Sequence, residues 1–155
     1  MRKYLCVFLV LFFFVGNLIA EENSSYIKPT FSFGFAFTKI SVYSEILTVL
    51  GLDVDFVTES GLTYGIQTIM LWNDKIGAEL LIGFGLGYTY SASIFSAGGK
   101  VLAVPFAYGG IGFDFNATYW FNNNIGLTGI IGFYTSMGSI DWSLFSLRIG
   151  ISSKL

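Results

Sequence analysis

Six charged side chains are the residues whose type and spacing are best suited to chemistry. Each stands on the small or polar side of an alternating segment, and together they are Asp53, Asp55, Glu79, Asp114, Arg148 and Lys154. Carboxylates can act as general acids or bases, bind hard cations or pair with arginine. Asp53 and Asp55 lack the loop of further oxygen ligands that a Ca²⁺ site needs. We therefore expect ion pairing, with no metal and no cofactor.

The sequence contains no histidine. This removes the usual general base, the Ser-His nucleophile pair and the commonest metal ligand. The glycines of Gly83-Phe-Gly-Leu-Gly87 have a spacing like that of a phosphate-binding loop, but they lie within apolar alternation and no helix follows. We therefore predict a protein that is not an enzyme and has no catalytic residues.

The elements that position the six charges are two-faced strands. The chain has 155 residues, enough for one domain, and 54% of them are hydrophobic while 12% are charged. Between Thr30 and Thr38, phenylalanines occupy every second position and Ser, Gly and Ala lie between them. Successive side chains of a strand point to opposite faces of a sheet. The pattern predicts antiparallel strands with one bulky apolar face and one small or polar face.

The composition of the second face indicates which side meets lipid. A soluble barrel has bulky apolar side chains inside, whereas a membrane barrel carries them outside. The small residues of this chain suit the narrow interior of an eight-stranded barrel. The six charges then point into the lumen, where Arg148 is expected to pair with Glu79 or Asp114. Such a network would be a structural plug or a charged constriction for small solutes.

A turn at Gly109-Gly110 divides a long apolar stretch and gives an even strand count of eight. A glycine bulge there would give an odd count. The segment 39–49 becomes the longest extracellular loop, and 91–100 becomes a periplasmic loop. The strands are predicted at 29–38, 50–57, 62–72, 76–90, 101–108, 111–121, 125–136 and 142–155.

Large aromatic residues occur near the predicted strand ends, where barrels carry girdles of aromatic side chains at the membrane interfaces. The residues assigned to these girdles are Trp72, Tyr88, Tyr90, Tyr119, Trp120, Phe121 and Trp142.

The N-terminus has the layout of a secretory signal peptide. Arg2 and Lys3 precede an apolar run from Tyr4 to Ile19, and Ala20 supplies a small residue for cleavage. The predicted organisation is a signal peptide at 1–20, a lead-in at 21–28 and a barrel at 29–155, with an uncleaved anchor as the alternative. Removal of residues 1–20 would lower the net charge from −2 to −4. This charge disfavours a nucleic-acid partner.

The export signal, the alternating strands and the final segment from Phe145 to Leu155 resemble the small outer-membrane barrels. These include the outer membrane protein W and X families and the barrel of outer membrane protein A. The phrase from Phe106 to Phe115 is also similar to small barrels of spirochaetes. Leu155 stands where these families commonly end in Phe, so the last residue departs from the assembly signal of these families. The resemblance implies outer-membrane lipid and the barrel assembly machinery as partners.

The predicted function is that of a non-enzymatic, monomeric integral protein of the bacterial outer membrane. It would be a structural or surface-exposed component, or a narrow channel for small or hydrophobic solutes. The alternative is a soluble periplasmic barrel, similar to a lipocalin, that binds a hydrophobic ligand. The two differ in the direction of Phe31, Phe33, Phe35 and Phe37.

Overall fold

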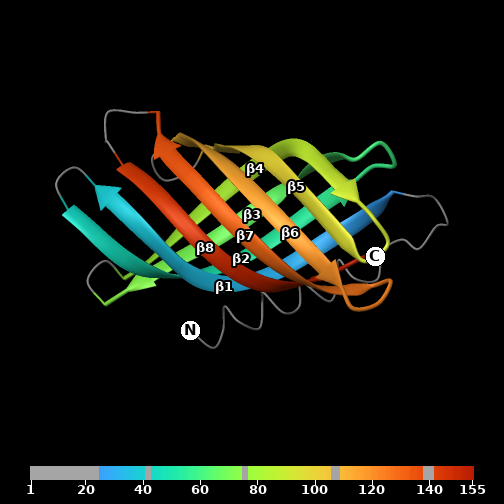
Figure 1. The fold of residues 1–155 in the computed structure, drawn as a ribbon. Helices are drawn as coiled ribbons and strands as arrows, with labels where there is room; N and C mark the ends of the chain where they lie inside the picture. Colours follow the sequence, from blue (N-terminus) through green and yellow to red (C-terminus); the bar gives the residue numbers. More distant parts are fainter. Residues whose placement is uncertain (1–24, 41–42, 75–76, 106–108, 138–141) are drawn as a thin grey trace.

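The protein is one closed barrel of eight antiparallel strands, in which each strand pairs with its sequence neighbours and β1 pairs with β8 (Figure 1). The computed structural model describes residues 25–40, 43–74, 77–105, 109–137 and 142–155. The strands are β1 (Tyr26–Ile40), β2 (Tyr43–Val57), β3 (Leu62–Asn73), β4 (Gly77–Ser91), β5 (Phe95–Val104), β6 (Gly110–Trp120), β7 (Ile125–Ser136) and β8 (Trp142–Ser153).

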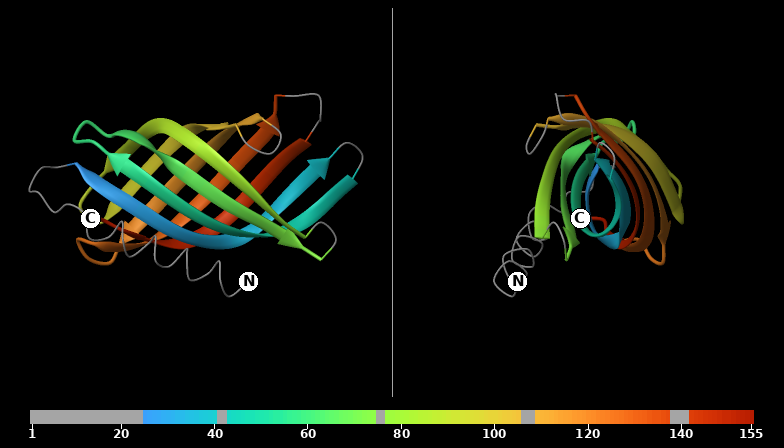
Figure 2. Two further views of the ribbon diagram at one scale, coloured as in Figure 1. Left: turned by 180° about the vertical axis from the view of Figure 1, so that it is seen from behind. Right: turned by 90° about the vertical axis from the view of Figure 1, so that its left-hand side faces the viewer.

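The first and last strands bring the two ends of the barrel chain together. Ile27 and Leu155 exchange backbone hydrogen bonds of 3.1 and 3.0 Å. We call this end of the barrel the terminal end and the opposite one the far end; Figure 2 shows the barrel from the side and obliquely along its length. The connections have three or four residues at the terminal end and two to five at the far end. The connections between strands are therefore short at both ends of the barrel.

The outer face is apolar. Phe31, Phe33, Phe35 and Phe37 all point outward, with exposed fractions of 37%, 59%, 60% and 49%. The same alternation continues around the barrel, as in β7, where exposed and buried residues alternate from Ile125 to Thr135. The alternative of a lipocalin-like barrel is wrong, because it requires these four rings to line the interior. No helix among the described residues has the length and hydropathy to cross a membrane.

The interior has two zones. Towards the terminal end it is polar and charged. Towards the far end it is filled by a cluster of buried, mostly apolar side chains from seven of the eight strands, which we call the apolar cluster. Its members are Ala36, Leu47, Val49, Ile69, Leu71, Leu81, Leu102, Val104, Tyr134, Trp142 and Leu144.

The predicted count of eight strands is confirmed. The chain turns between Val104, the end of β5, and Gly110, the start of β6, so a turn and not a bulge separates the two strands. Of the predicted pair, Gly109 lies in this connection with a φ of +58°, and Gly110 belongs to β6. β1 begins at Tyr26, ahead of the predicted start at residue 29. The predicted signal peptide, with most of the lead-in, lies outside the described residues.

Two predicted loops are wrong. The first is the segment 39–49, most of which belongs to β1 and β2. The second is the segment 91–100, more than half of which belongs to β5, so that β5 occupies 95–104 in place of the predicted strand 101–108. In the predicted strand 101–108, Leu102 and Val104 belong to the bulky apolar alternation that is expected to face outward, but both residues face inward. The physical reason is the apolar cluster: where the interior is apolar, large side chains occur on both faces of a strand and the alternation is hidden.

Candidate functional site

Arg148 lies at the centre of the polar zone. Its neighbours Leu147 and Ile149 point outward, so alternation along β8 turns the guanidinium into the barrel. Nη1 lies 3.2 Å from Oδ2 of Asp53, and Nη2 lies 2.7 Å from Oδ2 of Asp114. The Arg148 side chain is fully buried. A buried cation is tolerated only with charged or hydrogen-bonded partners, and the two carboxylates meet that need.

Two neutral side chains connect the same carboxylates. The Gln67 amide nitrogen donates to Oδ1 of Asp53 at 2.5 Å and also to Oδ2 of Asp114. The Tyr134 hydroxyl donates towards Oδ1 of Asp114, at 2.5 Å, and Oε1 of Gln67, at 2.9 Å. Nη2 of Arg148 donates to the Tyr134 hydroxyl oxygen at 3.3 Å. The strands β2, β3, β6, β7 and β8 are thereby joined across the lumen.

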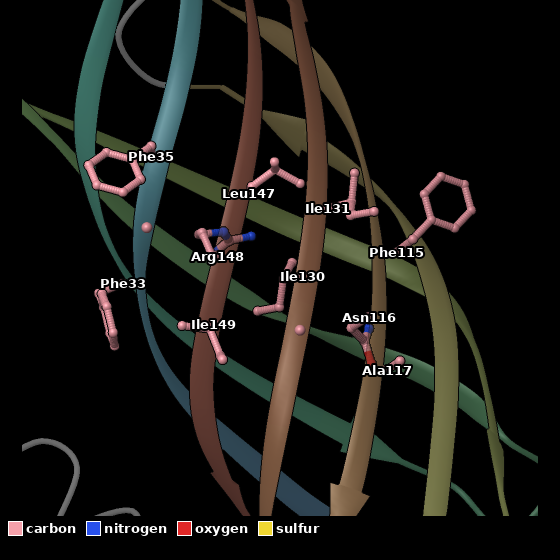
Figure 3. Close-up of a pocket in the computed structure, with 12 residues that line it drawn as sticks. Phe33, Phe35, Phe115, Asn116, Ala117, Ile130, Ile131, Leu147, Arg148 and Ile149 are labelled. Carbon is pink, nitrogen blue, oxygen red and sulfur yellow. The ribbon is translucent and has the colours of Figure 1, made fainter.

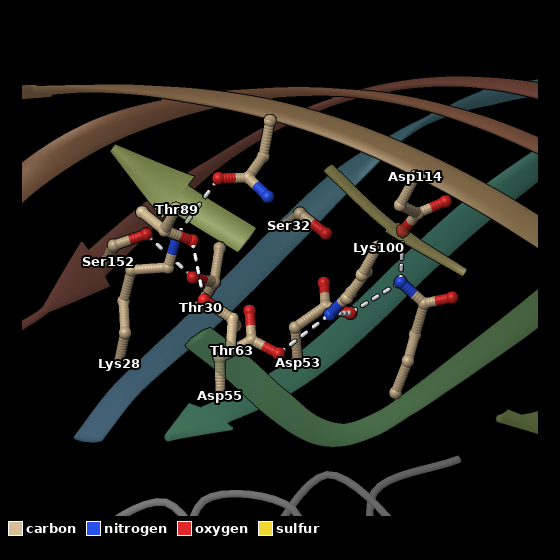
Figure 4. Close-up of polar contacts among 12 residues, drawn as sticks. Lys28, Thr30, Ser32, Asp53, Asp55, Thr63, Thr89, Lys100, Asp114 and Ser152 are labelled. Carbon is tan, nitrogen blue, oxygen red and sulfur yellow. Dashed lines mark hydrogen bonds and ion pairs between the residues drawn. The ribbon is translucent and has the colours of Figure 1, made fainter. Parts of the chain in front are cut away.

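Lys100 extends the arrangement towards the terminal end (Figure 4). Its Nζ lies 2.8 Å from Oδ1 of Asp55 and 3.5 Å from Oδ1 of Asp53. We call Asp53, Asp55, Gln67, Lys100, Asp114, Tyr134 and Arg148 the ionic network. Beside it, the buried Lys28 donates from Nζ to Oδ1 of Asn116 at 3.0 Å. With Lys28 included, the described residues contain three buried cations and three buried carboxylates, so the charges of these side chains balance.

Glycines make room for the network at two close approaches. A Cβ on Gly132 would lie 2.6 Å from Oδ1 of Asp114 and 2.7 Å from the Tyr134 hydroxyl. A Cβ on Gly51 would lie 2.6 Å from Nη1 of Arg148. Real Cβ atoms do not approach other atoms so closely, so any larger residue at either position would displace the network.

A chain of hydroxyl groups separates the network from the terminal end. Thr30 bonds to Ser152 at 2.6 Å, Ser152 to Thr128 at 2.5 Å, and Thr128 to Thr118 at 2.8 Å. These four residues come from β1, β8, β7 and β6, which meet where the barrel closes. The hydroxyls satisfy one another, which a buried polar group requires.

Lys154 lies at the mouth of the terminal end. Its Nζ is 4.3 Å from the centre of the Trp120 ring and 5.2 Å from that of Tyr26. Partial burial lowers the pKa of the Lys154 ammonium. The Tyr26 hydroxyl reaches across to Ser91 at 3.0 Å, and Nε1 of Trp120 donates to Ser96 at 3.1 Å.

Little free space remains inside the polar zone. The cavity between the network and Lys28 has a volume of about 10 Å³, and a cavity of that size holds about one water molecule. The carboxylates that border it are bonded to Lys100 and Arg148, which occupy the positions that a divalent cation would need. No cluster of three potential metal ligands occurs in the part of the chain that the structure describes. The chemistry of the site is therefore ion pairing and hydrogen bonding.

Four of the six charges singled out in the sequence, Asp53, Asp55, Asp114 and Arg148, come together in the network. Arg148 bonds to Asp114, one of its two expected partners. Glu79 has the predicted inward parity, since it lies opposite the buried Leu71. Its expected place in the network is wrong, because it lies at the far end of β4, in the apolar half of the barrel.

The prediction of a lumen-network role for Lys154 is also wrong. It follows β8 and stacks on rings at the mouth instead. The residues that sequence analysis missed are Lys28, Gln67, Lys100 and Tyr134. Gln67 was on the assigned polar face and could have been included. Lys28 and Lys100 were hidden because their segments were assigned to the lead-in and to a loop.

Five of the seven aromatic residues assigned to the interfaces, Trp72, Tyr88, Tyr90, Tyr119 and Phe121, are exposed on the outer side of the barrel. The assignments of Trp120 and Trp142 are wrong, because both are buried inside. Trp120 stands between two exposed aromatic residues, and strand alternation therefore turns it inward. Whether the other five lie at a membrane interface stays a prediction.

The fold is that of small outer-membrane barrels. Neisserial surface protein A matches with a TM-score of 0.63 and 13% identity over 86% of this chain and 98% of its own. Ail, the attachment invasion locus protein of Yersinia pestis, matches with a TM-score of 0.57 and 9% identity over 87% and 100%. The N-terminal barrel domain of Pseudomonas aeruginosa OprF matches with a TM-score of 0.54 and 8% identity over 86% and 98%.

The likeness lies in structure alone. No family model matches the sequence, and no curated protein matches it.

Proposed function

We propose that this chain is a non-enzymatic integral protein of the bacterial outer membrane whose lumen is closed. The observation that carries the proposal is the distribution of side chains between the two faces. Rings and branched aliphatic side chains cover the outside, while three cations and three carboxylates are buried inside. Such a barrel is stable where hydrocarbon surrounds it, since in water its outer face would be a very large exposed apolar patch.

The interior favours the structural role over the channel. A solute would have to pass the ionic network and then the apolar cluster. Every carboxylate of the network has a cation within ion-pairing distance, so no charge is free to replace the hydration of a passing ion. Apart from the Tyr134 hydroxyl, which is bonded within the ionic network, and the ring nitrogen of Trp142, the apolar cluster presents only hydrocarbon. A constriction of that kind excludes water and ions.

The short connections bear on the surface role. Outer-membrane barrels that present binding surfaces use long extracellular loops. Here no connection exceeds five residues, at either end. This favours a membrane-embedded structural component over an adhesin, although solved relatives in fold include a surface protein and an attachment protein.

Fractionation tests the proposal. We expect the protein in the outer-membrane fraction, and unheated samples should migrate differently from boiled ones in gel electrophoresis because the folded barrel is compact. In planar bilayers it should give no conductance steps above the bare membrane. Release into the soluble fraction would contradict the membrane assignment. Regular conductance steps would contradict the closed lumen and restore the channel.

A further inference from the structure

A groove of about 560 Å³ crosses the outer face of β6, β7, β8 and β1. Figure 3 shows Phe33 and Phe35 at one edge of this groove and Phe115 at the other. These three rings are between 59% and 62% exposed, so they stand well clear of the barrel wall. The volume lies within the range of about 300–1,000 Å³ that is usual for ligand pockets. The outer face is thus hollowed at one place.

The floor of the groove is made by two small residues, Ala117 and Gly129, which are register partners on β6 and β7. Ile149 on β8 is the next residue in this row. A Cβ added to Gly129 would meet no atom within 4 Å, so the space above it is open. Gly129 is exposed and has no positive φ, so the backbone does not require glycine there. The absence of a side chain at Gly129 therefore deepens the groove, and it is not needed for a turn of the backbone.

The walls are apolar on the side that faces outward. Ile131 and Leu147 stand between the rings, and each is 45% exposed. Two polar residues border the groove, Asn116 and Arg148, but both direct their polar atoms into the barrel, to Lys28 and to the buried carboxylates. A polar headgroup would find no partner here. The groove suits hydrocarbon.

The level of the groove along the barrel indicates which lipid can reach it. Gly129 is the fifth residue of β7, counted from the terminal end. With a rise of about 3.3 Å per residue and a tilt of about 40°, it lies roughly 10 Å above that end. The apolar band of such barrels is about 25 Å tall. The groove floor therefore falls in the half of the band nearest the termini.

We propose that this groove seats an acyl chain of a phospholipid from the periplasmic leaflet. The inference rests on the proposed function, because the termini must face the periplasm for the groove to lie in that leaflet. A single hydrocarbon chain is thin enough to reach the Gly129 floor between the projecting rings. A second copy of the barrel would meet Phe33, Phe35 and Phe115 first and leave the floor unfilled.

The test uses the full-length barrel reconstituted in vesicles of palmitoyl-oleoyl phosphatidylglycerol, extracted in a mild nonionic detergent and weighed by native mass spectrometry. The parent protein should retain one phospholipid. Gly129→Leu places a branched side chain over the floor of the groove, and this variant should lose the lipid. The control Ala103→Leu adds the same side chain at another exposed outward position, on β5, and should retain the lipid.

A second arm repeats the measurement with phosphatidylethanolamine that carries the same acyl chains. Equal retention supports recognition of the chain, whereas retention that depends on the headgroup overturns the inference. Equal retention by all three proteins also overturns it, as does a dimer mass that Gly129→Leu abolishes. If the protein inserts and shifts in gel mobility but retains no lipid, only this inference fails. If it does not insert at all, the proposed function fails.

Discussion

Nη2 of Arg148 and Oδ2 of Asp114 lie 2.7 Å apart, although β7 separates their strands. On the other side of Arg148, Asp53 belongs to β2, which β1 separates from β8. The guanidinium thus spans the seam at which the first and last strands meet.

Replacing Arg148 by methionine should strongly destabilise the barrel. The substitution keeps an unbranched side chain but leaves Asp53 and Asp114 without their shared cation. Removing one partner of a buried ion pair costs about 3–5 kcal/mol. Urea unfolding in vesicles, followed by tryptophan fluorescence, measures the loss. The control Lys39→Met removes an exposed charge and should change the free energy of unfolding by no more than about 0.5 kcal/mol.

The pair of Arg148 and Asp114 should be energetically coupled. In a double-mutant cycle, Arg148→Met together with Asp114→Asn should cost less than the two single changes summed, by about 0.5–3 kcal/mol, because the second change removes a buried charge that the first leaves unpaired. Unfolding free energies of the four proteins give the coupling. Arg148→Met combined with Lys39→Met should be additive. Additivity in both combinations would mean that the pair contributes nothing specific.

Gly132→Ala should destabilise the barrel by about 1–3 kcal/mol, because the new Cβ would overlap Asp114 and Tyr134. Gly129→Ala is a matched control on the same strand, since its Cβ points outward into open space. We expect a change of at most about 0.5 kcal/mol for the control. Thermal or urea unfolding of both variants is sufficient. Equal changes in the free energy of unfolding for the two variants would show that Asp114 and Tyr134 move away from the new Cβ of residue 132 without loss of stability.

An arginine in the middle of the outer face should oppose insertion. Leu86 is 59% exposed near the middle of β4, and Leu86→Arg should cost about 2–4 kcal/mol in a bilayer. Met137 follows β7 at the far end, where Met137→Arg should cost about 0–1 kcal/mol. Folding yields in vesicles compare the two. A similar yield for both variants would contradict a hydrocarbon environment around β4.

Removing the central cation of the ionic network should leave the lumen closed. Arg148→Ala takes away the central cation, but the apolar cluster still fills the far half of the barrel. Planar bilayers should therefore show no conductance steps for this variant. Steps that appear with Arg148→Ala would assign the seal to the network instead of the apolar cluster.

The outer face and the barrel could be predicted from the sequence because the alternation is strong wherever the interior is polar. Phe33, Phe35 and Arg148 stand in such regions, and their faces were assigned as the structure has them. Leu102 was assigned to the wrong face because the apolar cluster places large residues on both sides of β5. Local alternation carries no information about a neighbour across the lumen.

The partners of the charges could be predicted only in part. Asp114 was one of two candidates for Arg148, but Asp53 approaches because β1 pairs with both β2 and β8, which is a property of barrel closure. Lys100 was missed because its segment was predicted to be a loop and not a strand. Glu79 has the inward parity of Gly83 and Gly85, yet parity does not give height along the barrel. Contacts inside a barrel depend both on the parity of a residue and on its height along the barrel axis.

The connections of two to five residues at the two ends limit what the protein can show to its surroundings. An extended residue covers at most about 3.6 Å, so two to five residues supply little chain beyond the strands. In the proposed location, little polypeptide would project from the membrane. Antibodies, phages and proteases that approach the cell from outside would therefore have few accessible residues to bind or cleave.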